Sequence, residues 1–315
     1  MKNIDRNIFA AIDLGSNNCR LIITECSFED YKIIDTFSST VKLGENLSYS
    51  GEFSNAQIKK TVDVFDKISK KLEKFNVEAY RCIATQACRE AINTEKLVKE
   101  VKAKTGILVE VVSPKEEARL CLKSCLKYKD LNNENKLIFD IGGGSTEIIY
   151  KNKHSKNIPF DFISIPIGVI NLDQKIDLYS EQKICQEIEN DIKYFKNSLM
   201  RGVDSPFITI GSCSTITSLC ALHKNLEFYK KENVEGYDFQ ISDVYLAIKK
   251  VQQMSDEEKE KNKIIGSSRK LLLDNGIKIL DLILKNFAIE SIFVSDRGIK
   301  EGIIWDIIKT KQVNG

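Results

Sequence analysis

The sequence predicts an α/β protein made of two related halves. Short apolar runs that end in glycine-rich or polar turns alternate with longer segments in which apolar residues recur every three or four positions. This alternation is typical of strands followed by helices. An apolar run ending in Asp-x-Gly occurs at Asp13 and recurs at Asp140, which indicates an internal duplication. A chain of 315 residues also exceeds the usual size of one core, so two domains are expected.

The composition describes a folded protein without a strong charge. Hydrophobic residues make up 42% and charged residues 29%, which excludes a disordered chain. The 47 basic and 45 acidic residues leave a net charge of +2, so no global field favours DNA or a membrane, although a local basic cleft stays possible. No apolar stretch approaches the roughly 20 residues of a membrane span, and Asp13 interrupts the first apolar run. A cytoplasmic protein is expected.

The nine cysteines include no C-x-x-C pair. Cys121 and Cys125 are four residues apart on a predicted helix, and a metal pair there would need His154 or His223, which are distant in sequence. Reduced thiols, mostly buried as small apolar side chains, are the preferred interpretation.

The first half begins with a strand, a glycine turn and a second strand. Ser113 and Pro114, followed by Glu116 and Glu117, form a helix-start signal, with Ser as N-cap and Pro in the first position. The predicted strands are 8–12, 20–25, 79–84 and 107–112, and the predicted helices are 54–75, 94–104 and 115–128.

A polar, Asn-rich segment at 130–136 separates the halves, so we place the domains at 1–129 and 130–315, with the last helix able to pack back on the first domain. The second half repeats the strand, glycine turn and strand of the first. Its predicted strands are 136–139, 148–150, 207–210 and 291–294, and its predicted helices are 181–199, one after the 211–215 turn, 242–254, 269–286 and a last one through about Lys309.

The duplication aligns Asp13 with Asp140 and Gly15 with Gly142, and at the same offset Arg20 falls opposite Glu147. Each turn places a carboxylate at the end of a buried strand, next to small residues whose backbone N–H groups can cradle phosphate. A carboxylate beside phosphate needs a cation between them, and Mg²⁺ binds both kinds of oxygen. Asp13 and Asp140 therefore predict a magnesium–phosphate site between two facing halves, and a third Gly/Ser/Thr loop at 211–215 adds to this prediction.

These motifs resemble those of the exopolyphosphatase / guanosine pentaphosphate phosphohydrolase family, which belongs to the actin-like ATPase superfamily. The resemblance rests on seven segments that occur in the family's order across nearly the whole chain. They are Ala10-Ala-Ile-Asp-Leu-Gly-Ser-Asn-Asn, Ala84-Thr-Gln-Ala-Cys-Arg-Glu-Ala-Ile-Asn, Ser113-Pro-Lys-Glu-Glu-Ala-Arg-Leu, Phe139-Asp-Ile-Gly-Gly-Gly-Ser-Thr-Glu, Gly211-Ser-Cys-Ser-Thr, Arg269 with Gly276, and Ser295-Asp-Arg-Gly-Ile-Lys-Glu-Gly.

The resemblance implies two actin-like (ribonuclease H-like) domains with a cleft between them, and it assigns roles to site residues. Glu117 would be the general base for the attacking water, while Glu116 points elsewhere because adjacent helical residues lie about 100° apart. Glu147 would lie near metal and water, and Arg89 would hold phosphate oxygens with its planar fork. Arg20 is either an ion-pair partner in the cleft or a phosphate ligand. The metal, Mg²⁺ or Mn²⁺, would be bound by Asp13, Asp140 and Glu147, and phosphate by Gly15, Ser16, Asn17, Gly142, Gly143, Gly144, Ser145, Gly211, Ser212, Ser214 and Thr215.

The sequence departs from the family pattern at three positions that concern the site. Pro114 replaces a glycine, so the loop that enters the Glu117 helix can differ in conformation. Ser214 stands where glycine is usual, and Asn171 stands where the family often carries arginine, which would remove one basic phosphate contact.

Three functions are compatible with this sequence. The first is a hydrolase that removes terminal phosphate from polyphosphate or guanosine pentaphosphate. The second is a sugar- or acetate-kinase-like ATP phosphotransferase, and the third is a non-catalytic sensor of a phosphorylated nucleotide or polyphosphate, which the altered positions Pro114 and Ser214 keep open. Glu117 favours the hydrolase. Polyphosphate or guanosine penta- or tetraphosphate is the expected ligand, and a homodimer could extend a groove along a polyanion.

Overall fold

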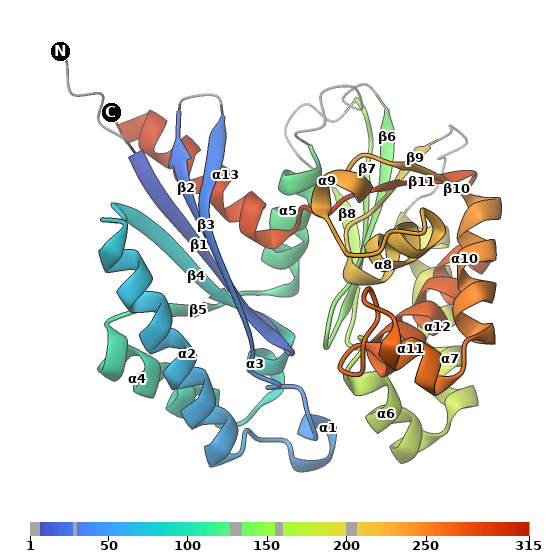
Figure 1. Ribbon diagram of the computed structural model, residues 1–315, viewed down its shortest axis with the longest axis horizontal. Helices are drawn as coiled ribbons and strands as arrows, with labels where there is room; N and C mark the ends of the chain where they lie inside the picture. The colour runs from blue at the N-terminus through green and yellow to red at the C-terminus, as the bar shows by residue number, and fades with distance from the viewer. Residues whose placement is uncertain (1–6, 28–29, 127–133, 155–159, 200–206, 315) are drawn as a thin grey trace. The chain divides into compact units, whose positions relative to one another are not determined.

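The computed structural model describes residues 7–27, 30–126, 134–154, 160–199 and 207–314. The chain divides into two compact units, one of Met1–Ser124 with Ile299–Gly315 and one of Cys125–Gly298 (Figure 1). The last helix thus belongs to the first unit, on which its sequence allows it to pack. The boundary expected at residues 129–130 lies outside the described residues.

In its described residues the first unit contains a five-stranded sheet in the order β3-β2-β1-β4-β5. β1 pairs antiparallel with β2 and parallel with β4, so the chain makes a hairpin before it crosses to the other side of β1. The strands are β1 (Asn7–Leu14), β2 (Asn18–Cys26), β3 (Tyr31–Thr40), β4 (Ala79–Ala84) and β5 (Val109–Val111).

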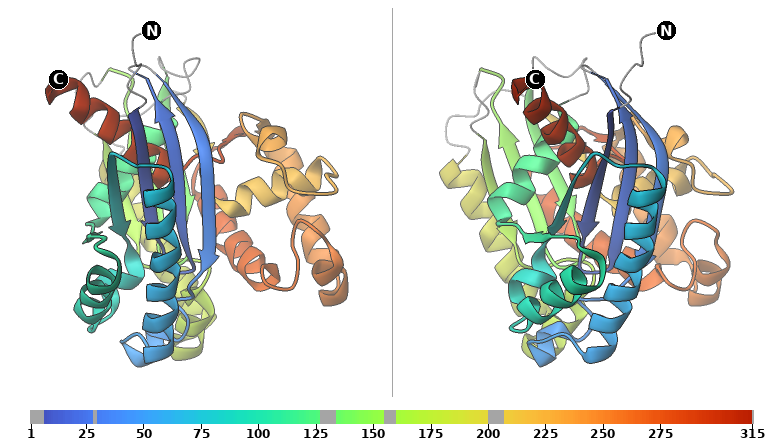
Figure 2. Two further views of the ribbon diagram at one scale, coloured as in Figure 1. Left: turned by 60° about the vertical axis from the view of Figure 1, so that its left-hand side comes forward. Right: turned by 90° about the vertical axis from the view of Figure 1, so that its left-hand side faces the viewer.

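Helices cover both faces of this sheet. Ala10, Ile12 and Leu14 of β1 belong to the core that α2 helps to form, whereas Phe9 and Ala11 pack in a second core with α13. This alternation is what a strand buried on both faces requires, and Figure 2 shows α2 and α13 along opposite faces of the sheet. The helices are α1 (Leu47–Ser50), α2 (Asn55–Lys74), α3 (Gln86–Glu90), α4 (Thr94–Thr105), α5 (Pro114–Cys125) and α13 (Ile299–Asn314).

The second unit is built around a six-stranded sheet, counted in its described residues, in the order β10-β11-β9-β6-β7-β8. Its strands are β6 (Asn135–Ile141), β7 (Thr146–Lys151), β8 (Asp161–Ile165), β9 (Phe207–Gly211), β10 (Asp238–Gln240) and β11 (Ser291–Val294).

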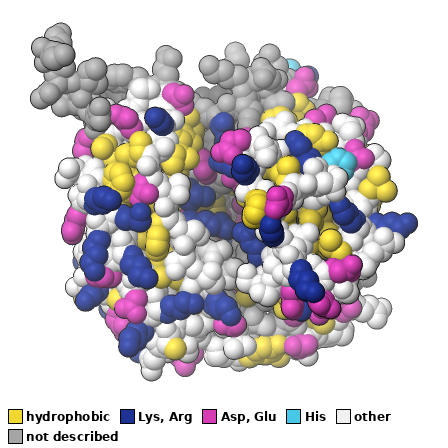
Figure 3. Space-filling view, in the orientation of Figure 1, with side chains coloured by type: hydrophobic (Ala, Val, Ile, Leu, Met, Phe, Trp, Pro, Cys, Tyr) yellow, Lys and Arg dark blue, Asp and Glu magenta, His cyan; other side chains and the backbone are white. Residues whose placement is uncertain are grey.

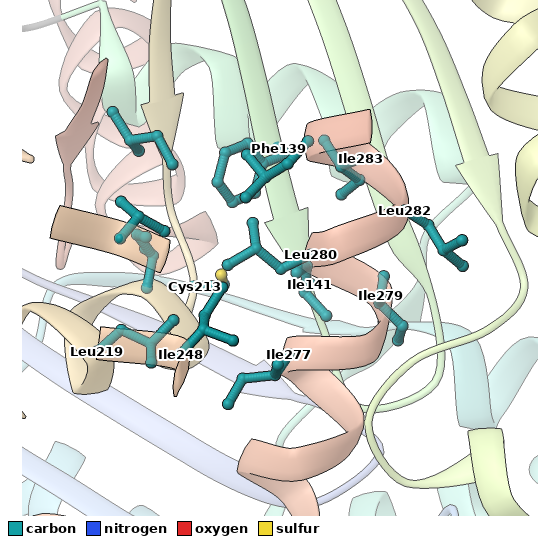
Figure 4. Packing of buried hydrophobic residues seen from close by; sticks show 14 of the residues in the cluster. Phe139, Ile141, Cys213, Leu219, Ile248, Ile277, Ile279, Leu280, Leu282 and Ile283 are labelled. Carbon is teal, nitrogen blue, oxygen red and sulfur yellow. The ribbon is translucent and has the colours of Figure 1, made fainter. Parts of the chain in front are cut away.

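The central strand of the second unit packs against its longest helix. Phe139 and Ile141 of β6 point toward Leu280 and Ile283 of α12 (Figure 4). The helices are α6 (Asn171–Tyr179), α7 (Glu181–Tyr194), a π-helical turn (Phe195–Leu199), α8 (Ser214–His223), α9 (Lys231–Val234), α10 (Ile241–Gln253), α11 (Asp256–Lys261) and α12 (Lys270–Asn286).

The internal duplication predicted from the sequence is confirmed by the register of the two hairpins. Asp13 lies directly opposite Arg20 in the β1–β2 pair, and Asp140 lies directly opposite Glu147 in the β6–β7 pair. The sheet orders also match, because β8-β7-β6-β9-β11 in the second unit repeats β3-β2-β1-β4-β5 in the first.

Sequence reasoning missed three edge strands and, among the described residues, the helices α1, α3, α6, α9 and α11. β3, β8 and β10 each lie at the edge of a sheet, and their side chains are largely exposed or half-buried, so the apolar alternation is weak. Some predicted bounds were also wrong. The strand expected at 107–112 is limited to β5, and the helix expected through residue 199 ends at Tyr194, where the π-helical turn continues the chain to Leu199.

All nine cysteines lie in the described ranges as free thiols, and eight are buried, as expected for small core side chains. In the part of the chain that the structure describes, no helix combines the length and apolar character of a membrane span. On the face seen in Figure 3, basic and acidic side chains are intermixed, in agreement with the small net charge.

Candidate active site

The predicted site residues follow the carboxyl ends of parallel strands in each unit. In the first unit, Gly15 follows β1, Arg89 lies on the short helix after β4, and Glu117 lies on the helix after β5. In the second, the 142–145 turn follows β6 and the 211–215 loop follows β9. The carboxyl ends of adjacent parallel strands lie at one edge of a sheet, which is where α/β proteins bind their ligands.

The glycine turn after β6 is held from one side by the segment 168–171. A bond from the Gly142 N–H to the Ser145 carbonyl, 2.9 Å long, closes the turn. Three carbonyl groups of the turn accept hydrogen bonds from that segment: Gly142 O from Val169 N at 3.0 Å, Gly143 O from Ile170 N at 2.8 Å, and Gly144 O from Asn171 Nδ2 at 3.0 Å. The carbonyl side of the turn therefore faces residues 168–171.

The N–H side of the same turn faces the opposite way. In a trans peptide the C=O of one residue and the N–H of the next point in opposite directions. The N–H groups of Gly143, Gly144 and Ser145 are therefore directed away from the 168–171 segment, as a row of three donors. Such a row is a nest that can bind a phosphate group.

Gly168 makes this contact between turn and segment possible. A Cβ atom at Gly168 would lie 2.5 Å from Gly142 O and 2.6 Å from the Gly143 carbonyl carbon, closer than real Cβ atoms approach backbone. Glycine is thus required here for close packing.

The turn after β1 uses the same geometry. The Gly15 N–H donates to Asn18 O at 2.9 Å, the counterpart of the Gly142–Ser145 bond. The next two carbonyl groups accept bonds from the segment 41–44: Ser16 O from Gly44 N at 2.8 Å, and Asn17 O from Val41 N at 2.8 Å and Lys42 N at 3.0 Å. The N–H groups of Asn17 and Asn18 accordingly point away from that segment. Of the phosphate-binding residues predicted here, Asn17 presents such a group, whereas the Gly15 N–H is bonded within the turn.

The second unit places two carboxylates side by side next to its nest. Asp140 and Glu147 are directly opposite each other in an antiparallel pair, so their side chains share one face of the sheet. Glu147 is only 2% exposed, and its Oε1 accepts a hydrogen bond of 2.7 Å from Ser164 Oγ on β8. Two like charges in this position destabilise a sheet unless a cation joins them. Their oxygen atoms suit Mg²⁺, which needs only one or two carboxylates in addition to water and phosphate.

The first unit neutralises its aspartate differently. Arg20 replaces the second carboxylate, and its Nη1 lies 3.9 Å from Asp13 Oδ2. Burial is the largest influence on Asp13 and raises its pKa above the ordinary value. The charges of Arg20 and Lys300 act in the opposite direction, and the charge of Glu301 raises the pKa further. Glu301 is 3% exposed, and its Oε2 lies 3.9 Å from Lys300 Nζ. Asp13 therefore has basic side chains beside it within its own unit.

Glu117 is held by the arginine that was expected to bind phosphate. Arg89 Nη1 donates to Glu117 Oε2 at 2.7 Å and to the Val112 carbonyl at 3.0 Å. Its Nε and Nη2 donate to Gln86 Oε1 at 3.1 and 2.7 Å. Glu117 is 6% exposed, so the ion pair is shielded from water. The structure thus brings Arg89 and Glu117 together, and in this arrangement the guanidinium orients the carboxylate.

The neighbouring Glu116 points elsewhere, as expected from the helical geometry. It accepts hydrogen bonds from Arg81 and Arg119, at 2.7 to 2.8 Å. The two adjacent glutamates of α5 therefore have separate partners, and only Glu117 faces Arg89.

The two loop substitutions fit regular helix starts. Pro114 is the first residue of α5, and Ser113 Oγ accepts a hydrogen bond from the Glu116 N–H at 3.2 Å, so the predicted N-cap is confirmed. Ser214 is the exposed first residue of α8. Neither position needs a backbone conformation that glycine alone adopts.

The third loop adjoins the β6 turn but is packed tightly into its unit. The Ser212 N–H donates to Phe139 O at 2.9 Å, and Ser212 Oγ donates to Arg297 O at 2.5 Å. Thr215 is buried, and a Cβ at Gly276 of α12 would lie 2.1 Å from its Oγ1. Of the residues predicted in this loop, Ser214 is exposed, whereas Gly211, Ser212 and Thr215 are buried.

Sequence reasoning missed four residues that support the site. Gln86 and Lys300 occupy variable positions of the quoted motifs, while Ser164 lies outside them and Asn171 was considered only for the arginine it replaces. Each was found through its contacts: Gln86 with Arg89, Lys300 beside Asp13, Ser164 with Glu147, and Asn171 with Gly144. The positions of Gln86 and Lys300 between motif residues were the usable signals.

Comparison with known proteins adds the family context. The model of the Ppx/GppA phosphatase family matches residues 23–311. A Ppx/GppA family member from Aquifex aeolicus is 26% identical, with a TM-score of 0.77 over 96% of this chain and 98% of that one. An exopolyphosphatase structure from Cytophaga hutchinsonii, 22% identical, shares the fold with a TM-score of 0.82 over 96% and 98% of the two chains. The expected fold class, α/β with two actin-like domains, is thereby confirmed.

Two curated relatives are longer than this chain. A bifunctional 3-dehydroquinate synthase/phosphatase from Fusobacterium nucleatum is 29% identical over 322 residues, which cover 96% of this chain and 47% of the relative. A guanosine-5'-triphosphate,3'-diphosphate pyrophosphatase from Pseudoalteromonas atlantica is 24% identical over 328 residues, covering 99% of this chain and 61% of the relative. The chain therefore spans about half to three-fifths of these proteins' lengths.

Proposed function

Because this chain belongs to the Ppx/GppA phosphatase family, we propose that it hydrolyses the terminal phosphoanhydride bond of inorganic polyphosphate or of guanosine pentaphosphate. The relative from Pseudoalteromonas atlantica is named for the guanosine substrate, and the structural relative from Cytophaga hutchinsonii for polyphosphate. Both substrates end in a phosphoanhydride-linked phosphate, which is the group that the glycine turns suit.

The observation that carries this proposal is the carboxylate pair beside a phosphate nest. Asp140 and Glu147 share a sheet face at the end of the strand that leads into the 142–145 turn. In the proposal these carboxylates hold Mg²⁺ or Mn²⁺, and the N–H groups of Gly143, Gly144 and Ser145 hold phosphate oxygens. The bound metal would neutralise charge on the phosphate oxygens. The paired Asp13 and Arg20 of the first unit make its turn less dependent on a metal.

Glu117 is the proposed general base. The Arg89 hydrogen bond fixes its carboxylate, and burial limits competition from bulk water. The carboxylate takes a proton from the attacking water as the water oxygen bonds to the terminal phosphorus. The bond from that phosphorus to the bridging oxygen breaks, and the shortened polyphosphate or guanosine tetraphosphate leaves with the bonding electrons. Orthophosphate is the second product.

The test is release of phosphate from each substrate by the purified protein with Mg²⁺. Polyphosphate, guanosine pentaphosphate and ATP are offered separately, with and without a chelator. Glu117→Gln removes the base while keeping the shape, so we expect kcat to fall by about 10²- to 10⁴-fold. Glu116→Gln is the matched control, because this neighbour on the same helix turn bonds Arg81 and Arg119 instead.

The outcomes separate the functions. Release from polyphosphate or guanosine pentaphosphate that is lost in Glu117→Gln, kept in Glu116→Gln and lost with the chelator supports the proposal. Full activity in Glu117→Gln would reject the base assignment. Transfer from ATP to a small acceptor would favour a kinase, and tight binding without release from any substrate would favour a sensor.

A further inference from the structure

We infer that Asn171 is a positioning residue for the phosphate nest, the row of N–H groups from Gly143, Gly144 and Ser145. It acts by holding the Gly144 carbonyl through a hydrogen bond. Asn171 is 3% exposed and lies at the first position of α6. Its Nδ2 donates to Gly144 O at 3.0 Å and to Pro166 O at 3.3 Å, and its Oδ1 accepts from the Gly168 N–H at 2.7 Å. The side chain therefore bridges the turn and the segment behind it.

The orientation of this amide is determined by its three partners. One partner is an N–H donor and two are carbonyl acceptors, so only the side chain oxygen can face Gly168 and only the nitrogen can face Gly144 and Pro166. A flipped amide would set oxygen against two carbonyl oxygens. Asn171 is thus held in the one arrangement that directs a donor at Gly144.

Three hydrogen bonds from the 168–171 segment hold the carbonyl groups of the turn, and only the one from Asn171 depends on the identity of a side chain. The Gly142 and Gly143 carbonyls accept from the main-chain N–H groups of Val169 and Ile170, which any residue other than proline supplies. The Gly144 carbonyl accepts from a side chain. A substitution at position 171 therefore releases the Gly144 peptide and leaves the other two bonds in place.

The Gly144 peptide is the one that orients the last donor of the nest. Its carbonyl and the Ser145 N–H belong to the same planar group, so a carbonyl held toward Asn171 directs that N–H away from it. Gly144 has no Cβ to restrict rotation of this peptide. Without the bond to Asn171, the peptide can rotate and point a carbonyl oxygen, rather than an N–H, toward bound phosphate.

The segment that carries Asn171 is itself anchored. Asn275 of α12 is 2% exposed and donates from Nδ2 to Val169 O at 3.1 Å. On the other side, Thr146 Oγ1 donates to Ile167 O at 2.7 Å. The position of the Asn171 side chain is therefore fixed from both sides, as expected for a group that orients a binding loop.

This inference rests on the proposed function for its kinetic consequence. A nest donor contacts phosphate in the bound substrate as well as in the transition state, so its loss raises KM more than it lowers kcat. For Asn171→Leu and Asn171→Asp we expect KM for guanosine pentaphosphate or polyphosphate to rise about tenfold or more, with kcat changed by less than about threefold. Asn171→Asp keeps the acceptor for the Gly168 N–H and replaces the donor with a charged oxygen, whereas Asn171→Leu removes the donor without adding charge.

Rescue and control variants separate positioning from general damage. Asn171→Gln keeps the amide and should recover part of the KM, because its longer side chain still offers the donor. Asn286→Leu is the matched control, since the Asn286 amide donates to Leu282 O within its own helix at 2.8 Å. Its KM should equal that of the wild type. Loss of folded protein alone would lower apparent kcat and leave KM unchanged.

Hydrogen exchange provides a readout that does not require activity. The Gly168 amide should exchange faster in Asn171→Leu, because its acceptor is gone, while the Val169 and Ile170 amides keep theirs.

If the wild type releases no phosphate, the proposed function fails, and the dissociation constant for tripolyphosphate with Mg²⁺ replaces KM in the same comparison. A folded Asn171→Asp with wild-type KM and dissociation constant, or an equal rise in Asn286→Leu, would overturn the inference. Wild-type protein that binds no tripolyphosphate would overturn it as well.

Discussion

At the scale of single residues, neighbouring side chains with the same chemistry have different surroundings. Glu116 and Glu117 are adjacent on α5, yet one bonds Arg81 and Arg119 and the other bonds Arg89. The first is part of a charged network that stabilises its unit. The second is buried in the first turn of α5, the helix that follows β5, where a fixed carboxylate can act on water.

Arg89→Lys tests whether Arg89 orients Glu117 or binds phosphate itself. A lysine cannot bond Glu117, Val112 and Gln86 together, because it lacks the planar fork. If Arg89 orients the base, kcat should fall about 10- to 100-fold with little change in KM, as measured by steady-state phosphate release.

Arg119→Lys is the control for that variant, because Arg119 also bonds a glutamate of α5 but belongs to the structural network. It should change thermal stability and leave kcat per folded molecule unchanged. An increase in KM with normal kcat in Arg89→Lys would instead assign Arg89 to phosphate binding.

At the scale of elements, two copies of one hairpin have acquired different electrostatics. Both copies close the glycine turn with the same backbone bond, 2.9 Å long in each. The first copy sets an arginine opposite its aspartate, and the second sets a glutamate there. The same backbone therefore carries an aspartate paired with an arginine in the first copy and two carboxylates side by side in the second.

The packing of α13 on α5 depends on a glycine. A Cβ at Gly302 would lie 2.1 Å from the Leu120 carbonyl oxygen, which belongs to backbone and cannot rotate away. Gly302→Ala should therefore push the two helices apart and lower the free energy of unfolding by about 1–3 kcal/mol. Urea denaturation monitored by circular dichroism measures this change.

Gly298→Ala provides the comparison, since a Cβ at Gly298 meets no heavy atom within 4 Å. It should cost clearly less stability than Gly302→Ala. Equal stability of the two variants would show that α13 can shift on α5 without loss of packing.

At the scale of the whole chain, its last segment returns to complete the first unit. Ile303, Ile304 and Trp305 of α13 enter a core with the first strand, and Asp306 on the same helix bonds Arg119 and Lys123 of α5. Arg81 of β4 joins the network at 3.4 Å from Asp306. The first unit therefore depends on residues from both ends of the sequence.

The network predicts how stability depends on pH. Burial raises the pKa of Asp306, but hydrogen bonds from Arg119 and Lys123 outweigh it and hold the pKa below its ordinary value of 3.8. The hydrogen bond from Arg119 likewise lowers the pKa of Glu116 below 4.5. A lowered folded-state pKa contributes stability above the unfolded pKa, and this contribution is lost as pH falls through the folded pKa.

Asp306→Asn should therefore destabilise the protein at pH 7 by about 2 kcal/mol, and the difference from wild type should shrink below about pH 4. Urea denaturation at both pH values measures it. Asp66→Asn, which removes an exposed pair with Lys70 on α2, should have a far smaller effect at either pH. A difference for Asp306→Asn that grew on acidification would contradict the assignment.

The sequence by itself determined the α/β class, the duplicated hairpins and most of the central strands and long helices. These features depend on local signals, namely apolar periodicity, turn glycines and helix caps, which act over a few residues. Motif order also identified the family and led to Glu117, Asp140 and Glu147. Asp140 and Glu147 lie near the ends of β6 and β7 that flank the glycine turn, and Glu117 lies in the first turn of α5.

Only the tertiary structure decided which partner each of these residues has. Arg89 meets Glu117 across 28 positions of sequence, and Ser164 reaches Glu147 across 17. Asn171 holds Gly144 across 27, and Asp306 bonds Arg119 across 187. The edge strands β3 and β8 were missed for a related reason: their half-exposed faces carry little apolar pattern, and pairing with a neighbouring strand defines them. Hydrogen bonds and ion pairs depend on distance in space, which no local pattern in the sequence records.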